Sequence, residues 1–239
     1  MATRTTDRLA VLIDADNVPA KHSAEIFEEI ATLGEAGLRR IYGDFSNGSP
    51  QGWDAKTMSE YAIVPHQQFA NTSKKNSSDI ALVIDAMDIL HSGRFGGFVL
   101  VSSDSDFTRL ASRIREQGLD VFGIGENKAP RAFVAACNRF IYIENIEASV
   151  PHEERDNALK SKRELNHAFQ LIRNVMRNFD EPEGWLKLGL VGSQLNKIYT
   201  DFDPRTYGFS KLSELVRATG KFDEKGTNGD FKIRLKAGR

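Results

Sequence analysis

The sequence contains a single cysteine, Cys137, among 239 residues. One cysteine excludes an intramolecular disulfide and a cysteine-based zinc site, and it favours a reducing, cytoplasmic setting. The five histidines show no spacing typical of metal ligands. No apolar run approaches the roughly 20 residues that a membrane-spanning helix needs, and the first residues lack the apolar core of a signal peptide. We therefore expect a protein with no membrane partner.

The net charge is also small, at −1, but it is unevenly distributed along the chain. Residues 1–160 hold 17 Lys and Arg against 23 Asp and Glu, whereas residues 161–239 hold 15 against 10. An acidic first part and a basic second part indicate two modules with different electrostatic roles. The basic module is a candidate for binding a polyanion, although a mixed solvated surface has a similar charge.

The first 145 residues alternate between short apolar runs and helical patterns. The runs are continuously apolar, which is typical of strands buried on both faces of a parallel sheet. We therefore predict an α/β sandwich with helices on both sides of a parallel sheet. The expected strands are 9–13, 38–42, 62–66, 97–102, 120–124 and 140–143, and the expected helices are 19–33, 53–60, 79–91, 106–117 and 129–138.

A second module follows a segment that loses the apolar rhythm. Residues 147–162 are rich in charge, and we interpret them as a linker. Helices are expected near 163–178, 189–199 and 208–219, and a hairpin with turn residues 227–230 comes after them. Three helices and a β-ribbon within residues 163–239 indicate a winged helix-turn-helix domain.

Acidic residues follow three of the predicted strands. Because the carboxyl ends of parallel strands meet at one edge of a sheet, we expect these side chains to lie close together. Closely spaced carboxylates repel one another unless a cation is present, and oxygen ligands suit Mg²⁺ or Mn²⁺. Such an ion supports phosphodiester hydrolysis. The set comprises Asp14, Asp16, Asp44, Asp79, Asp104 and Asp106, with Asn17 beside the first and Ser102 and Ser103 as hydroxyls for a scissile phosphate.

Each acidic residue also has a structural alternative. Asp104 or Asp106 could cap the helix that follows, with Asp106 the stronger candidate, and Asp79 could complement a helix dipole. Asp44 could belong to a turn. Asp85 lies away from the apolar face that we expect to be buried on its helix, and it is either solvated or supports the site. That expected face consists of Ile80, Val83, Ile84 and Met87.

Four ordered motifs resemble the NYN domain family, a branch of the PIN-like ribonucleases. They are VLIDADNVP (11–19), YGDFS (42–46), KKNSSDIALVIDAMD (74–88) and SSDSDF (102–107), followed by GIG (123–125). The resemblance covers about residues 7–146. It implies a parallel α/β sheet whose clustered aspartates bind Mg²⁺ or Mn²⁺ and cut RNA. The catalytic and metal-binding residues that it implies are Asp14, Asp79, Asp104 and Asp106, with Asp85 at a recurrent supporting position.

The second module has a resemblance of its own. FDPRTYGFSKLSELV (202–216) and FKIRLK (231–236) resemble the LOTUS (OST-HTH) domain, a winged-helix RNA-binding module. The resemblance implies RNA, single-stranded or structured, as the partner, and it leaves open whether the chain forms a homodimer. In the alternative interpretation, the aromatic residues of this segment belong to the core. The candidate RNA contacts are Arg205, Tyr207, Lys211 and Arg217 here, and Lys74 and Lys75 in the first module.

Three functions fit these patterns. The first is a metal-dependent endoribonuclease with an appended RNA-binding domain. The second is an RNA-binding protein whose acidic site does not turn over substrate. The third is a phosphatase in which Asp14 would be a covalent nucleophile and Asp16 an acid, because Asp14-Ala15-Asp16 follows an apolar strand.

Overall fold

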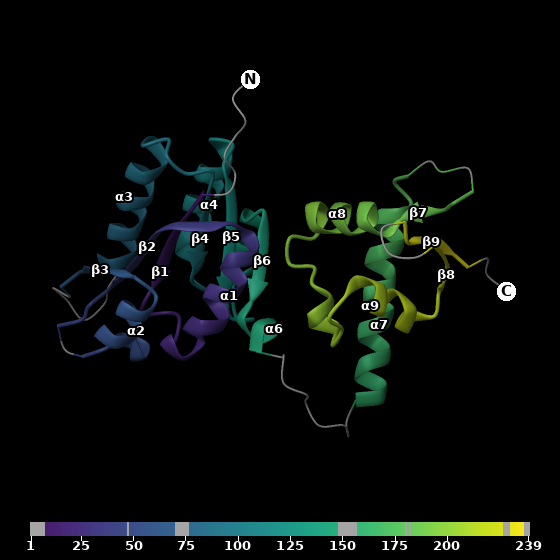
Figure 1. Ribbon diagram of the computed structural model, residues 1–239, viewed down its shortest axis with the longest axis horizontal. Coiled ribbons are helices and arrows are strands. Elements are labelled where there is room, and N and C mark those ends of the chain that lie inside the picture. The colour runs from purple at the N-terminus through teal and green to yellow at the C-terminus, as the bar shows by residue number, and fades with distance from the viewer. Residues whose placement is uncertain are drawn as a thin grey trace. The chain divides into compact units, whose positions relative to one another are not determined.

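The computed structural model describes residues 8–46, 48–69, 77–147, 157–179, 181, 183–226 and 230–236. The chain divides into two compact units, residues 1–147 and 148–239 (Figure 1). Within the described ranges, no helix is both long and apolar enough to cross a membrane.

The first unit is built on a six-stranded sheet whose neighbouring strands are all parallel, which confirms the predicted fold class. The strand order is β3-β2-β1-β4-β5-β6, so the direction in which the chain winds reverses between β1 and β4. In open α/β sheets, ligands bind at such a reversal, outside the carboxyl ends of the strands. The strands are β1 (Arg8–Asp14), β2 (Glu35–Gly43), β3 (Val64–Gln67), β4 (Gly97–Val101), β5 (Asp120–Gly125) and β6 (Arg139–Tyr142).

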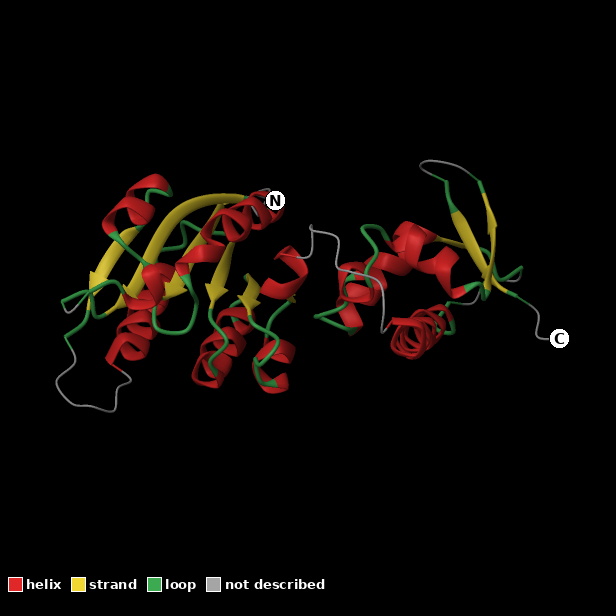
Figure 2. Ribbon diagram, turned by 90° about the horizontal axis from the view of Figure 1, so that it is seen from below, coloured by secondary structure: helices red, strands yellow, loops and turns green. Residues whose placement is uncertain are grey.

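Each face of the sheet is covered by helices, which create two apolar cores (Figure 2). Neighbouring side chains of a strand point to opposite faces, so Leu12 packs in the first core and Ile13 in the second. Helices α3 (Ser77–His91), α4 (Thr108–Glu116) and α5 (Arg131–Ala136) enclose the first core. The second lies under α1 (Ser23–Leu33), α2 (Ala55–Glu60) and α6 (Ile143–Glu147). Three short 3₁₀ helices, η1 (Ala20–His22), η2 (Pro50–Gly52) and η3 (Ser105–Phe107), lie in the connections.

Helix α3 buries only part of the predicted face, because Val83 and Met87 pack against the first core but Ile80 and Ile84 do not. Ile80 and Ile84 are each 58% exposed, whereas Leu82 and Ala86 are buried against the sheet. The helix is apolar on more than one side, so its periodicity alone does not identify the buried face. The sheet makes the choice, because the rotation that buries Leu82 also brings Asp85 to polar groups of β2.

The second unit contains three helices and a small antiparallel sheet, the architecture of a winged helix. Its sheet order is β7-β9-β8, and its core includes Ile172, Leu195, Leu215 and Ile233. The predicted turn residues 227–229 lie outside the described ranges. The elements are α7 (Asn157–Met176), β7 (Leu186–Lys187), α8 (Leu188–Ile198), η4 (Pro204–Tyr207), α9 (Leu212–Thr219), β8 (Phe222–Lys225) and β9 (Lys232–Leu235).

Helix α7 begins within the predicted linker. Residues 157–162 are helical, so the segment that we interpreted as a linker is helical over its last part. The sequence there, NALKSK, contains alanine, leucine and lysine, which are favourable in helices. The high charge of this segment therefore did not distinguish a helix from a linker.

Candidate active site

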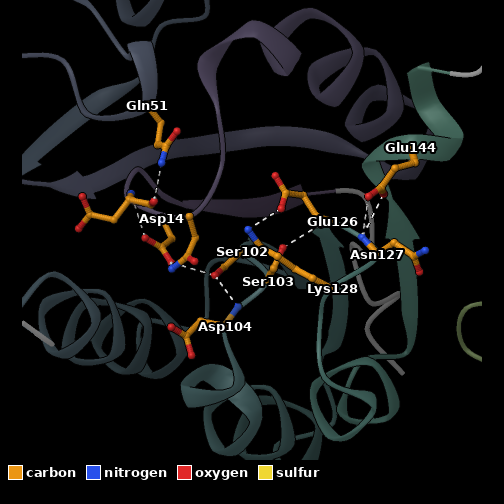
Figure 3. Close-up of polar contacts among 11 residues, drawn as sticks. Asp14, Gln51, Ser102, Ser103, Asp104, Glu126, Asn127, Lys128 and Glu144 are labelled. Atoms are coloured by element: carbon orange, nitrogen blue, oxygen red, sulfur yellow. Dashed lines mark hydrogen bonds and ion pairs between the residues drawn. The ribbon is translucent and has the colours of Figure 1, made fainter.

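The candidate site lies where β1 and β4 end side by side, at the reversal of the strand order. Asp14 is the last residue of β1, and Ser102, Ser103 and Asp104 follow β4 directly (Figure 3). Strand pairing aligns Ile13 with Val101. The polar residues that follow the two strands therefore lie next to each other at the same edge of the sheet. Two segments that are 88 residues apart in sequence thus form one surface of the site.

Asp14 is buried, with 1% exposure, and its carboxylate accepts three hydrogen bonds. Ser102 Oγ donates to Oδ2 at 2.8 Å, and Asn17 Nδ2 donates to the same oxygen at 2.7 Å. The backbone N–H of Asp16 donates to Oδ1 at 3.2 Å. Burial raises the pKa of Asp14, and the hydrogen bonds oppose that rise because they favour the charged form. The carboxylate therefore has a fixed orientation.

Ser102 connects the two strand ends. Its Oγ accepts a hydrogen bond from the backbone N–H of Asp104 at 3.0 Å while it donates to Asp14. We predicted that Ser102 would contact a phosphate, but its hydroxyl is buried and engaged in this chain of hydrogen bonds. Its contribution is to position the backbone of Asp104 relative to the carboxylate of Asp14.

Asp104, and not Asp106, is the cap of the segment that follows β4. Its Oδ1 accepts a hydrogen bond from the backbone N–H of Asp106 at 2.9 Å at the start of η3. Asp106 lies in the first turn, where a carboxylate complements the helix dipole. Asp104 retains partial exposure and a second carboxylate oxygen, so capping leaves it capacity to bind a cation.

Asp79, in the first turn of α3, completes the acidic cluster. Its pKa is raised to about 6, first by burial and then by repulsion from Asp14, Asp104, Asp106 and Asp16, in that order. Ser78, immediately before it, donates to Asp16 Oδ2 at 3.3 Å and so links α3 to the loop after β1. Carboxylates from three separate segments are therefore close enough to repel one another.

A second loop supports the site from β5. Ser103 Oγ accepts a hydrogen bond from the backbone N–H of Glu126 at 2.8 Å, and the backbone N–H of Asn127 donates to Glu144 of α6 (Figure 3). A Cβ at Gly125 would lie 2.4 Å from the carbonyl oxygen of Ser102, so this glycine permits the close approach. Ser103 thus has a structural role, whereas we predicted a phosphate contact.

Asp44 and Asp85 are engaged elsewhere. Asp44 accepts hydrogen bonds from the backbone N–H of Ser46 at 3.0 Å and from Gln67 Nε2 at 2.8 Å, as a turn residue does. Asp85 forms an ion pair with Arg40 at 2.5 Å and accepts a hydrogen bond from the hydroxyl of Tyr42. Neither carboxylate is among the groups that raise the pKa of Asp79.

The donor set suits a hard divalent cation. Within the described ranges, no three His, Cys, Asp or Glu side chains are arranged as a preformed metal site. Mg²⁺ commonly binds through one or two carboxylates and completes its shell with water and substrate phosphate, so it does not need three. The mutual repulsion at Asp79 shows that the cluster concentrates negative charge, which a cation would relieve.

The predicted RNA contacts have different environments. Lys74 and Lys75 lie outside the described residues. Arg205 forms a bidentate ion pair with Asp203, with Nη2 at 2.6 Å from Oδ2. Tyr207 packs against Phe202, and burial raises its pKa to about 12. Both of these side chains therefore stabilise the domain.

Lys211 and Arg217 instead line a groove of about 920 Å³ in the second unit. The groove is lined by residues of α8 and α9 and by Phe231, which precedes β9. The guanidinium carbon of Arg217 lies 5.0 Å from the centre of the Phe231 ring. Lys187 also lines it, and sequence reasoning missed this residue because a lone lysine before a helix carries no distinct signal. Sequence reasoning also missed Ser78, Glu126 and Glu144, whose roles depend on contacts between distant segments.

The first unit is a parallel α/β sheet with carboxylates at its reversal point. The NYN domain family matches residues 8–144, and the OST-HTH/LOTUS domain family matches residues 163–232. The chain belongs to the NYN family and carries a LOTUS domain after the NYN domain.

A solved structure of a protein of unknown function from Vibrio parahaemolyticus is 22% identical to this chain, with a TM-score of 0.46. The match covers 61% of this chain and 98% of that one. No curated protein matches the chain.

Proposed function

We propose that this protein is a metal-dependent endoribonuclease whose LOTUS domain binds RNA. The observation that carries the proposal is the acidic cluster at the strand reversal, where Ser102 joins the carboxylate of Asp14 to the backbone of Asp104. Asp79 belongs to the same cluster, because burial and then repulsion from four other aspartates raise its pKa. Membership of the NYN family, a branch of the PIN-like nucleases, supports the same conclusion. The phosphatase alternative gains no support from the two family matches.

Asp14, Asp79, Asp104 and Asp106 would hold Mg²⁺ or Mn²⁺. The ion would supply activation of water and stabilisation of charge on the phosphoryl oxygens. Asp14 would be the most rigid ligand, because Ser102 and Asn17 fix one of its oxygens. The serine and the amide therefore have a positioning role.

Asp79 is suited to proton handling as well as to ligation. Burial and repulsion from neighbouring aspartates raise its pKa to about 6. A group that titrates near the working pH exchanges protons most effectively with a reacting oxygen. We infer that Asp79 orients the attacking water.

The groove of the second unit would bind the RNA. Lys187, Lys211 and Arg217 line it together with Glu214, and Lys187 and Arg217 form ion pairs with Asp230 and Glu224. Phe231 supplies an aromatic ring beneath Arg217. Cations that follow a backbone together with an aromatic side chain are typical of single-strand binding. The OST-HTH/LOTUS match over residues 163–232 supports this assignment.

The test is cleavage of end-labelled and internally labelled RNA by the full chain with Mn²⁺, with EDTA as the control. Asp14→Asn and Asp104→Asn should reduce cleavage to the EDTA level while circular dichroism shows a folded protein. Asp88→Asn is the matched control, because Asp88 is exposed on α3. Full cleavage by both site variants would overturn the assignment, and internal products distinguish endonucleolytic from exonucleolytic cutting.

A second candidate is RNA binding without turnover. It is supported by the groove of the second unit, because its lining by Lys187, Lys211 and Arg217 does not depend on the acidic site. The same assay discriminates the two functions, because a protein that only binds RNA would retain it without forming products under any divalent ion.

A further inference from the structure

A second charged site lies at the amino ends of the strands, at the opposite end of the sheet from the acidic cluster. It is a hollow of about 610 Å³, and its lining includes Arg8, Arg39, Arg40 and Arg94. These arginines come from the start of β1, from β2 and from the segment before β4. Strand β3 pairs with β2 only from Arg40 onward, so the hollow lies beside the first half of β2.

The charge of this hollow is positive. Its described lining contains four arginines and no carboxylate. Asp85, from outside the lining, forms an ion pair with Arg40 at 2.5 Å. Among the described residues, no ion pair joins Arg8, Arg39 or Arg94 to a carboxylate. Like charges gathered around one space repel one another, and an anion would relieve that repulsion.

Three of the four guanidinium groups are held in place, that of Arg40 by its ion pair with Asp85. Arg8 lies across Gly37 and places its guanidinium carbon 5.6 Å from the centre of the Phe95 ring. A Cβ at Gly37 would come within 2.5 Å of Arg8 Nε, so the missing side chain makes room for the arginine. Arg39 donates from Nη1 to the carbonyl oxygen of Tyr61 at 2.7 Å. Side chains that are already ordered lose less entropy when they bind a ligand.

We propose that this arginine hollow, formed by Arg8, Arg39, Arg40 and Arg94, binds backbone phosphates of the RNA outside the cleavage site. Guanidinium groups are planar donors that match phosphate oxygens, often with two parallel hydrogen bonds. The proposal rests on the proposed function, because that function brings an RNA strand to this unit. It adds a site that the acidic cluster does not contain.

The position of the hollow sets the length of RNA that can reach both sites. Strand β1 has seven residues, which at about 3.3 Å each separate its two ends by about 20 Å. A stacked strand advances about 3.4 Å per nucleotide, and β1 is buried, so an RNA that passes over the surface needs at least about six nucleotides to connect the two sites. A shorter RNA would therefore contact one of the two sites at a time, whereas a longer one can contact both.

The experiment measures RNA affinity of the full chain in EDTA at several salt concentrations, with RNAs of 4 and 20 nucleotides. The test variant is Arg8→Gln with Arg94→Gln, and the matched control is Arg113→Gln with Arg131→Gln, which removes two exposed arginines outside the hollow. For the 20-nucleotide RNA, the test variant should bind severalfold more weakly, and the slope of log K against log salt should fall by about 1.4, or about 0.7 per lost phosphate contact. The 4-nucleotide RNA, which cannot reach both sites at once, should lose less affinity than the 20-nucleotide RNA.

Gly37→Ala provides a second variant that keeps every charge. It displaces Arg8, so it should weaken binding of the 20-nucleotide RNA, but less than the double variant does. Equal binding of the long RNA by the unchanged protein and both test variants would overturn the proposal. Inorganic phosphate, AMP and a polyglutamate peptide serve as further probes. If the test variants lose affinity only for these probes and not for RNA, the proposal is also overturned, because the hollow would then bind a free phosphate or an acidic protein. Since binding is measured without catalysis, an inactive acidic site leaves this test intact.

Discussion

Ser102 Oγ lies 2.8 Å from Asp14 Oδ2 and donates a hydrogen bond to it, which joins the end of β4 to the end of β1. The same oxygen accepts from the backbone N–H of Asp104. One hydroxyl thus sets the relative positions of two of the proposed metal ligands. Because both its partners belong to the site, its removal should affect stability and cleavage together.

Ser102→Ala should lower the free energy of unfolding by about 1–3 kcal/mol, since it leaves a buried N–H without its acceptor and removes a donor from Asp14. Urea denaturation at pH 7.5 measures the change. Ser59→Ala, on the exposed surface of α2, is the control and should stay within about 0.5 kcal/mol. A Ser102 variant as stable as the control would show that water replaces the hydroxyl.

Asp79→Asn should change the pH dependence of stability. The pKa of Asp79 is raised from 3.8 to about 6 in the folded protein, so its protonation stabilises the fold below about pH 4, and that contribution is lost as the pH rises through 6. Asparagine cannot ionise and does not undergo this loss. Without divalent ions, the melting temperature of Asp79→Asn relative to the unchanged protein should therefore rise between pH 4 and pH 7.5. Asp88→Asn should show no such trend, and a falling difference for Asp79→Asn would contradict the prediction.

Addition of Mn²⁺ at pH 7.5 should raise the melting temperature of the unchanged protein, because a ligand that binds the folded state stabilises it. The rise should be smaller for Asp79→Asn and for Asp14→Asn, since each removes a negative charge from the proposed site. Differential scanning fluorimetry with a Mn²⁺ titration measures both effects. Identical shifts in these variants and in Asp88→Asn would place the binding of Mn²⁺ elsewhere.

Asp85→Ala should destabilise the fold by about 1–3 kcal/mol, because Arg40 and the hydroxyl of Tyr42 both lose their acceptor. Burial and the neighbouring carboxylate raise the pKa of Tyr42, so this tyrosine remains a hydrogen-bond donor at neutral pH. Chemical denaturation measures the loss, with Asp88→Ala as the control on the same helix. If Asp85→Ala is as stable as the unchanged protein, the contacts of Asp85 with Arg40 and Tyr42 do not contribute to the free energy of unfolding.

Gly125→Ala should impair cleavage and stability, because the new Cβ would meet the carbonyl oxygen of Ser102 at 2.4 Å. The backbone after β4 would have to move, and Asp104 would move with it. Ser59→Ala is the control, because Ser59 is exposed on α2 and lies in neither proposed site. Unchanged cleavage by Gly125→Ala would mean that this loop accommodates the methyl group without disturbing the site.

Much of the candidate site could be predicted from the sequence because parallel strands end at a common edge. The positions of Asp14, Asp104 and Asp79 after two strands and at the start of a helix were sufficient to place them together. The motifs further identified the family of each module, and the family matches confirm both. The sequence did not predict which serine binds which carboxylate, because these hydrogen bonds join segments that are far apart in sequence.

The sequence by itself determined the parallel sheet, the helices on its two faces and the aspartates at its edge, since each follows from local periodicity and strand direction. Only the tertiary structure decided the partners of Asp85, which shares helix α3 with Asp79. The packing that buries Leu82 and Ala86 brings Asp79 to the acidic cluster and Asp85 to Arg40. The arginine hollow likewise exists only in the folded chain, because its four arginines come from separate segments that the sheet brings together.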